Sequence, residues 1–369
     1  MDIYRMSKLR VSVVFATLLC AAGVCRAQST DLTAPPAPAA PPAAQAPPVE
    51  LAAHTISIDV EARDKQGNPI AGLKPEDFTL LDNKQPRKIV DFQEVDTHGT
   101  VADPVHVIIV IDTINTEFDV VARERQQLGE FLKQNDGHLA HPTSLAFLTE
   151  KGLRMQQASS RDGNVLLASL EGANSELRSV GRSAGFWGAT ERLQRSLDQL
   201  TQLAVFEGTK PGRKLAFFIS PGWPLLPLAG ADATDKERRW TFSAVMGLTN
   251  TLRESHLTLY SIDPHHLGNT DPFYYQSFLK PVSAVNQVQY PHLGLQVLAA
   301  HSGGLVEVTG MDIVGEINTA IRDADAWYSI TFEAPVPDKR NEYHGLQLQV
   351  DKPGVVARTT AGYYANVQN

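Results

Sequence analysis

Ser183 is the residue whose surroundings most directly suggest chemistry. It lies in Gly181-Arg-Ser-Ala-Gly185, which matches the G-x-S-x-G pattern of a nucleophile elbow, where a serine attacks a carbonyl carbon. Asp263 and His301 follow in the chain order that such hydrolases use. The elbow needs a buried strand directly before it, whereas residues 175–180 are polar and carry two charges. A serine hydrolase is therefore an alternative function for this chain and not the favoured one. If Ser183 is not a nucleophile, Gly181 and Gly185 are explained by the flexibility of a loop.

Asp263-Pro-His-His266 is a second cluster with metal-ligating residue types. Two adjacent histidines cannot both face one site from a regular element, and no third ligand stands at a spacing such as H-E-x-x-H. A solvated loop is the favoured interpretation, with a zinc or copper site as the alternative. The loop continues over residues 267–290, whose aromatic side chains suit an interface or pack back on the domain; these are Phe273, Tyr274, Tyr275, Phe278 and Tyr290. Trp223, between two prolines, could add to the same face.

The middle of the chain alternates between predicted strands and helices. Val105–Ile111 is nearly all aliphatic, which is typical of a strand buried on both faces of a parallel sheet. Further strands are predicted at 144–148, 215–219, 257–262 and 305–308, and helices at 119–133, 164–170, 189–206, 241–253, 293–300 and 313–324. This order predicts an α/β fold, a doubly wound sheet with helices on both faces. Asp112, Ser220 and Asp263 then lie at strand ends, where ligands gather in such sheets.

Alternating apolar and polar residues predict further strands on both sides of this region. They fall at 55–62, 78–81 and 88–92, and again at 328–333, 345–350, 355–358 and 361–365. Neither set has enough strands to cover its own face. We therefore expect both sets to form one small antiparallel β-sandwich in which the α/β domain is inserted. The expected boundaries are 54–98 and 326–369 for the strands and 99–325 for the inserted domain.

The first part of the chain has a different composition. A basic start, an apolar stretch of about fourteen residues and small residues before a cleavage site near Ala27 predict a signal peptide over 1–27. The apolar stretch is shorter than the ~20 residues of a spanning helix, and an uncleaved anchor stays the alternative. Residues 28–53 are rich in proline and alanine and predict an extended linker. We expect an exported protein, periplasmic or extracellular.

Charge and cysteine content exclude several classes of protein. The 369 residues carry a formal net charge of −8, and a mildly acidic chain without a basic face is a poor candidate for binding nucleic acid. The two cysteines, Cys20 and Cys25, exclude a disulfide scaffold and a four-cysteine zinc site. Both lie in the predicted signal peptide, so its cleavage would leave a chain without cysteine.

Six motifs, in order along the chain, resemble bacterial von Willebrand factor A (vWA)-related proteins found largely in Acidobacteria. The motifs are Val60–Leu73 with Glu76-Asp-Phe78, His106–Asp112 with Asn115-Thr116, Gly212–Ser220, Leu259–Asp263, Leu298–Gly304 and Ala361–Tyr364. The resemblance covers roughly residues 55–365. It implies a vWA fold and an adhesion or scaffolding role, without a known partner. We expect protein interaction or adhesion in the bacterial envelope and no catalytic residue. A structural component of the envelope is a further alternative.

The resemblance also implies a metal-ion-dependent adhesion site, in which oxygen ligands hold Mg²⁺. That site takes an Asp-x-Ser-x-Ser loop after the first strand, a Thr from a second loop and an Asp after the fourth strand. Asp112 and Thr116 match the first loop, but Ile114 replaces its first serine and Pro221 stands where the last aspartate is expected. Near the second loop, Ser183 is only a displaced substitute.

We therefore expect a degenerate adhesion site, one that has lost several of its metal ligands. No cofactor is expected to be needed, and Mg²⁺ is expected to bind weakly at most. The alternative is that Asp112 caps the turn that follows it, while Asn115 and Thr116 bond to the local backbone. We expect partner binding at the strand-end face, which we define as the residues at and beyond the carboxyl ends of the sheet strands. The residues predicted to bind there are Asp112, Asn115, Thr116, Ser183, Ser220, Trp223 and Asp263.

Overall fold

The computed structural model describes the chain over residues 55–96, 105–173, 185–225, 233–264, 273–308 and 312–365. All of them belong to one unit, Glu50–Asn369. The predicted signal peptide, the linker, Ser183, His265 and His266 lie outside the described residues, so their predictions stay as they are. In the part of the chain that is described, none of the helices has the length and apolar character needed to cross a membrane.

A mostly parallel sheet forms the centre of the inserted region. Its strands run in the order β11-β10-β9-β5-β6-β7, and β8 pairs with β6 beside β7. Five strands are parallel, and only the short β7 and β8 are antiparallel to β6. The strands are β5 (Val105–Asp112), β6 (His138–Thr149), β7 (Gly152–Met155), β8 (Ser160–Asp162), β9 (Arg213–Ile219), β10 (Leu257–Ile262) and β11 (Val306–Glu307). Counted along the chain without β8, the order is 3-2-1-4-5-6, that of a doubly wound fold.

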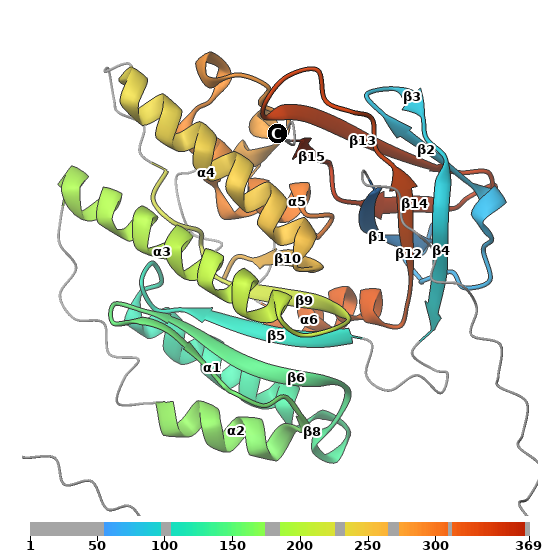
Figure 1. Ribbon diagram of the computed structural model, residues 1–369. Coiled ribbons are helices and arrows are strands. Elements are labelled where there is room, and N and C mark those ends of the chain that lie inside the picture. The colour runs from blue at the N-terminus through green and yellow to red at the C-terminus, as the bar shows by residue number, and fades with distance from the viewer. Residues whose placement is uncertain are drawn as a thin grey trace, which may run out of the picture. The chain divides into compact units, whose positions relative to one another are not determined.

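Helices cover both faces of this sheet (Figure 1). On one face α1 (Phe118–Leu132), α2 (Gly163–Gly172) and α6 (Ile313–Ala320) bury their apolar sides. On the other face lie α3 (Gly185–Gly208), α4 (Asp235–Glu254) and α5 (Leu295–His301).

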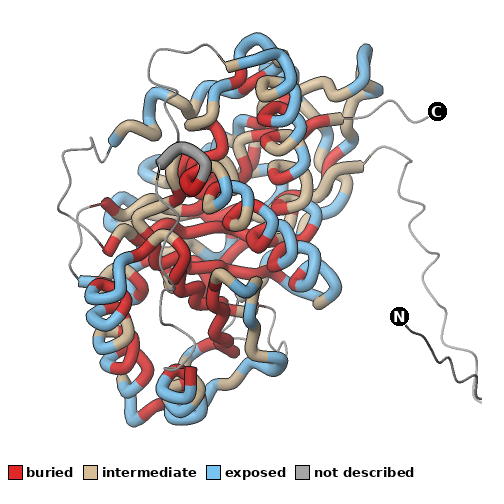
Figure 2. Tube along the Cα trace, turned by 90° about the vertical axis from the view of Figure 1, so that its left-hand side faces the viewer, coloured by how far each residue is buried: buried red, intermediate tan, exposed pale blue. Residues whose placement is uncertain are grey.

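Alternate residues of β5 supply the two cores between these layers. Val107, Ile109 and Ile111 pack toward the first set of helices, whereas Ile108 and Val110 pack toward the second. Figure 2 shows the buried strands between helices whose outer sides are exposed. A parallel strand between two helix layers is buried on both faces, which explains why residues 105–111 of β5 are nearly all aliphatic.

The N- and C-terminal strands mix in two antiparallel sheets. One sheet has the order β14-β1-β12-β4 and the other β15-β13-β2-β3. Side chains from both sheets share one core, in which Val60, Leu80, Ile330 and Leu346 are buried. The strands are β1 (Thr55–Arg63), β2 (Phe78–Asp82), β3 (Gln85–Pro86), β4 (Ile89–Asp96), β12 (Ala326–Glu333), β13 (Glu342–Val350), β14 (Val356–Thr359) and β15 (Gly362–Ala365). The expected α/β fold inserted in a split β-sandwich is confirmed.

Short 3₁₀ helices complete the described elements. They are η1 (Pro75–Asp77), η2 (Gln134–Gly137), η4 (Tyr274–Phe278), η5 (Val285–Gln287), η6 (Tyr290–Leu293) and η7 (Ile321–Ala324). Three of them, η4 to η6, lie between β10 and α5, in the aromatic stretch that the sequence predicted as a long loop.

A buried ion network joins the sandwich to the amino ends of the sheet strands. Arg213, the first residue of β9, pairs with Glu61 of β1 and donates to the backbone oxygen of Asp323 at 2.9 Å. The Asp323 carboxylate in turn accepts from the Tyr260 hydroxyl at 2.6 Å and pairs with two further arginines, Arg63 and Arg358. Asp112 is the last residue of β5, so it lies at the opposite, carboxyl end of the parallel strands.

Candidate functional site

The centre of the candidate site is the point where the strand order of the sheet reverses. The helix after β5, α1, covers one face, whereas the helix after β9, α4, covers the other. In such sheets a crevice opens between the carboxyl ends of the two strands, and ligands bind there. Asp112 ends β5 and Ser220 follows β9, and the Ser220 hydroxyl donates to Asp112 Oδ2 at 2.7 Å. The structure therefore brings these two predicted site residues together.

Both oxygens of the Asp112 carboxylate accept hydrogen bonds from the protein. Oδ1 accepts from the backbone N–H groups of Ile114 and Asn115 at 2.9 and 3.1 Å. Oδ2 accepts from the Asn115 side-chain amide at 2.8 Å, in addition to Ser220. Asp112 is 0% exposed, and this burial raises its pKa, while the hydrogen bonds from Asn115 and Ser220 oppose the rise. The carboxylate closes the turn after β5, in the way an aspartate commonly does.

Neighbouring side chains hold this arrangement in place. The Asn115 amide also donates to the Ser196 hydroxyl of α3 at 2.9 Å. Ser220 accepts from the backbone N–H of Gly222 at 3.0 Å, where the chain turns with a φ of 88° that suits glycine. Thr116 and Ser220 are both buried. The loop after β5 is thus tied to α3 and to the loop after β9.

The described residues of this site do not fit Mg²⁺. A hard cation needs oxygen ligands that can turn toward it, but the Asp112 oxygens already accept four hydrogen bonds, and Ile114 offers no oxygen in its side chain. Over the part of the chain that the structure describes, no three His, Cys, Asp or Glu side chains are placed to hold a metal ion.

Trp223 and Asp263, which were also predicted to bind at this face, differ in burial. Trp223 is buried in the core that α3, α4 and α5 share with the sheet, and its indole N–H donates to the Leu293 oxygen at 2.6 Å. It therefore presents little surface to a partner. Asp263 is half-buried at the end of β10, where its backbone N–H donates to the Glu307 oxygen at 3.1 Å.

Most of the aromatic stretch after β10 packs back on the domain. The Tyr274 hydroxyl donates to Gln296 Oε1 at 2.7 Å, and the Gln296 amide reaches the Pro221 oxygen at 3.4 Å. Phe278 packs edge-on against the ring of His292, with 5.4 Å between the ring centres. Because Pro221 follows β9, these contacts place η4 at the carboxyl edge of the sheet. Phe273, directly before η4, stays exposed.

Glu124 is a buried acid that the sequence analysis did not single out. It is 0% exposed in the middle of α1, and neither carboxylate oxygen has a hydrogen-bond partner. Burial raises its pKa well above the ordinary value, the negative charges of Asp112 and Asp263 add to the rise, and Arg123 opposes it. A signal was present, because Val120, Glu124 and Leu128 are spaced by four residues and so share the apolar side of the helix.

A second missed cluster has the hydrogen-bond order of a catalytic triad. His106 Nε2 lies 3.0 Å from the Ser144 hydroxyl, and His106 Nδ1 lies 2.9 Å from Glu207 Oε2. Triads are recognised by such geometry, but Ser144 is 2% exposed and lies within β6, in register with Ile108 of β5. A substrate has no approach to a hydroxyl inside the sheet. The cluster is a buried hydrogen-bond relay near the amino edge.

Comparisons with known proteins found no matching protein-family model and no matching curated protein. Solved structures do match. The human COPII-coat protein Sec24c is 11% identical with a TM-score of 0.31, over 80% of this chain and 50% of that one. The pilus adhesin SpaC from Lactobacillus rhamnosus GG is 10% identical with a TM-score of 0.34, over 80% of this chain and 49% of that one. The SpRpn10 VWA domain is 11% identical with a TM-score of 0.28, over 58% of this chain and 93% of that one.

The chain spans about half the length of the first two of these structures. At such identities and TM-scores the likenesses carry no argument about family or function. The strand order and the shared sandwich define the class, an α/β protein with a doubly wound sheet inserted in a β-sandwich. The resemblance to vWA proteins implied the doubly wound sheet, whereas the split sandwich was predicted from the number of strands.

Proposed function

We propose that this chain is an exported vWA-like protein of the bacterial envelope that binds another protein through its strand-end face and is not an enzyme. The observation that carries the proposal is a set of exposed aromatic side chains at this edge. Phe118, Trp240 and Phe273 are 59%, 39% and 46% exposed. They follow β5, β9 and β10, three neighbouring strands of the sheet.

These three positions support a docking surface for a protein partner. Phe118 is the first residue of α1 and Trp240 lies in the second turn of α4, so both stand near the carboxyl edge from which their helices start. Phe273 is held at the same edge by the contacts of its neighbour Tyr274. Aromatic side chains are enriched in protein interfaces and often contribute most of the binding energy.

The polar residues at the same edge favour binding over catalysis. An acid or base in catalysis must reach the proton that it transfers, whereas Asp112 and Ser220 are buried and bonded to each other. The basic and apolar segments before Ala27 support export, and the Pro/Ala-rich stretch that follows supports a linker to the folded part. The proposal assigns neither a metal nor a cofactor.

The proposal is tested by recovery of partners from envelope extracts. The full chain is compared with a variant that carries Phe118→Ser, Trp240→Ser and Phe273→Ser. Phe206→Ser is the matched control, because Phe206 is 41% exposed at the end of α3, beside the amino edge of the sheet. We expect the triple variant to lose the proteins that the wild type and the control retain.

Two results would decide against the proposal. Equal recovery of every protein by wild type and triple variant would remove the strand-end face as the binding surface and favour a structural role in the envelope. Ester hydrolysis by the purified chain that disappears in Ser183→Ala would establish the serine hydrolase instead.

A further inference from the structure

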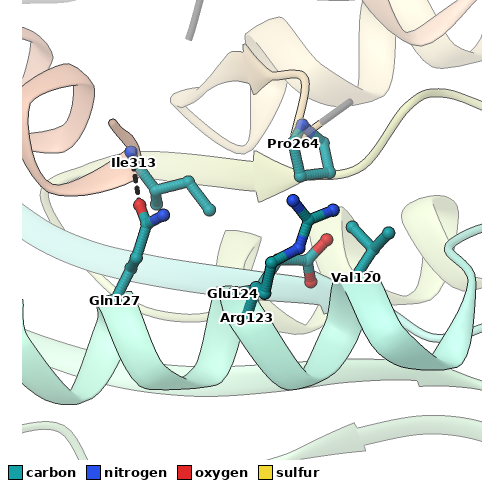
Figure 3. A pocket seen from close by; sticks show the side chains of 6 residues that line it. All are labelled: Val120, Arg123, Glu124, Gln127, Pro264 and Ile313. Carbon is teal, nitrogen blue, oxygen red and sulfur yellow. Dashed lines mark hydrogen bonds between the residues drawn. The ribbon is translucent and has the colours of Figure 1, made fainter. Parts of the chain in front are cut away.

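A small pocket opens between α1, α6 and Pro264, which is the second residue after β10 (Figure 3). Its volume is about 20 Å³, room for a group about the size of one water molecule. Its walls are formed by Val120, Arg123, Glu124, Gln127, Pro264 and Ile313. The pocket therefore suits a small chemical group rather than a large ligand.

The Glu124 carboxyl is the unusual member of this lining. Both of its oxygens are shielded from solvent, and neither has a hydrogen-bond partner. A buried carboxylate without a partner is strongly disfavoured, and desolvation keeps the group protonated to a higher pH than usual. Gln127, one turn further along α1, accepts instead from the Ile313 backbone N–H at 2.8 Å. The Glu124 carboxyl is therefore a hydrogen-bonding group in the pocket that the protein does not use and that a ligand can bind.

Negative charge dominates the surroundings of this position. Asp112 and Asp263 both act on Glu124, and Arg123 is the only cation that acts on it among the described residues. Glu316 of α6 is a further acid on which Asp263 acts, and burial raises its pKa to about 7. Its carboxylate oxygens are also buried without a hydrogen-bond partner. A ligand that carries positive charge is therefore favoured over an anion or a neutral molecule.

The residues that line the pocket favour an organic cation over a metal ion. A metal ion would need several charged or polar ligands, and the described residues offer no group of three acids or histidines around one point. Val120, Pro264 and Ile313 instead supply apolar walls next to the single buried carboxyl (Figure 3). An ammonium group on a short methylene chain matches this combination, because it donates three hydrogen bonds from one end and buries apolar surface along the rest.

We propose that this pocket binds the primary ammonium group of an aliphatic ligand, with Glu124 as its acceptor and Val120, Pro264 and Ile313 around the methylene chain. On binding, the Glu124 carboxyl gives its proton to solvent, and the resulting carboxylate pairs with the ammonium group. The exposed Arg123 side chain, which extends from the same turn of α1 toward Pro264, moves aside (Figure 3). The inference does not depend on the function proposed above.

The same chemistry can come from a lysine side chain or from a free diamine, and calorimetric titration separates the two sources. The probes are butylammonium, 1,4-diaminobutane and Nα-acetyl-lysine methylamide, titrated into the full chain, with butanol as the neutral control. Glu124→Gln removes the charge at nearly constant shape. Glu130→Gln is the matched control, since Glu130 lies on the exposed side of the same helix.

We expect the wild type and Glu130→Gln to bind the amines equally and Glu124→Gln to bind them about tenfold or more weakly, the loss of one charge-assisted hydrogen bond. The measured heat should change with the ionisation enthalpy of the buffer, because Glu124 releases its proton. A melting temperature of Glu124→Gln at or above that of the wild type excludes unfolding as the cause.

Tighter binding of the lysine analogue supports a partner's lysine as the source, and tighter binding of the diamine supports a free amine. The proposal is overturned if the wild type binds no amine at millimolar concentration, or if Glu124→Gln binds as the wild type does. Tighter binding of a guanidinium compound or of Mg²⁺ than of butylammonium would equally overturn it, because the ligand class would be wrong.

Discussion

Arg213 is the central cation of the buried ion network, and its replacement by methionine tests what that network contributes. Its side chain is fully buried and pairs with Glu61, which is itself only 3% exposed. Arg213→Met keeps an apolar chain of similar length, so its main effect is to leave the Glu61 carboxylate with one partner fewer. Breaking a buried pair from one side costs about 3–5 kcal/mol of unfolding free energy.

The structure favours the lower end of this range. Glu61 keeps a second partner, because its Oε2 lies 3.4 Å from Arg358 Nε. We therefore expect a loss of about 3 kcal/mol, and at roughly 2–4 °C per kcal/mol for domains of this order of size a melting temperature lower by about 6–12 °C. Urea unfolding followed by circular dichroism gives the free energy, and calorimetry gives the melting temperature.

A matched control and a double variant make the test specific. Arg195→Met removes a half-buried arginine of α3 that pairs with Glu191 at 2.6 Å and with Glu150 at 3.2 Å, and each such partly exposed pair contributes about 1 kcal/mol or less. Glu61→Gln combined with Arg213→Met should recover part of the lost stability, because no unpaired charge then remains. The reasoning is refuted if Arg213→Met costs no more than Arg195→Met.

Three further predictions concern residues at or near the strand-end face. Ser220→Ala removes one of the four donors to buried Asp112 and should lower the unfolding free energy by about 1–3 kcal/mol in urea titrations; an unchanged midpoint would show that the bond contributes nothing. The pKa of Glu316 is raised to about 7, so the folded state holds more protons than the unfolded state between its ordinary pKa near 4.5 and about 7, and stability should fall as the pH rises through this window. Glu316→Gln should flatten that decline in melting temperature, and a parallel decline in both proteins would contradict the assignment. Calorimetric titration with Mg²⁺ should give no micromolar binding, whereas clear binding that Asp112→Asn abolishes would restore the metal site.

The sequence predicted the architecture because burial leaves strong patterns in the buried strands. The expected strand at 257–262 coincides with β10, and the aliphatic run 105–111 lies within β5. The shared sandwich followed from counting strands, since neither set can cover its own face. The short β7 and β8 were missed, because three or four residues at a sheet edge are too few to show a period.

Helix boundaries and single side chains were harder to predict. α4 begins at Asp235 and not at 241, because its first turn is polar and is held by a capping box between Thr234 and Glu237 rather than by apolar contacts. Trp223 stands between prolines that suggest an exposed loop, yet it packs in the core through a contact with Leu293, which is distant in sequence.

The His106 cluster shows a third reason why parts of the structure could not be predicted from the sequence. His106, Ser144 and Glu207 come together through the register of β5 with β6 and the position of the end of α3. No local pattern encodes such a register. The position of Glu124 on the apolar side of α1 could have been predicted, because it is spaced by four residues from Val120 and Leu128. The pocket beside it could not have been predicted from the sequence.

The mixing of early and late strands in the sandwich has a consequence for how the chain folds. Among the strands that the structure describes, β1 pairs only with β12 and β14, and β4 pairs only with β12. During synthesis these two strands must wait until the whole inserted region has been made, and closing so long a loop slows their pairing. Until then β1 exposes alternating apolar side chains and unpaired backbone edges, the features of an aggregation-prone strand. The doubly wound sheet, whose strands are closer in sequence, is therefore expected to fold first and to bring the two halves of the sandwich together.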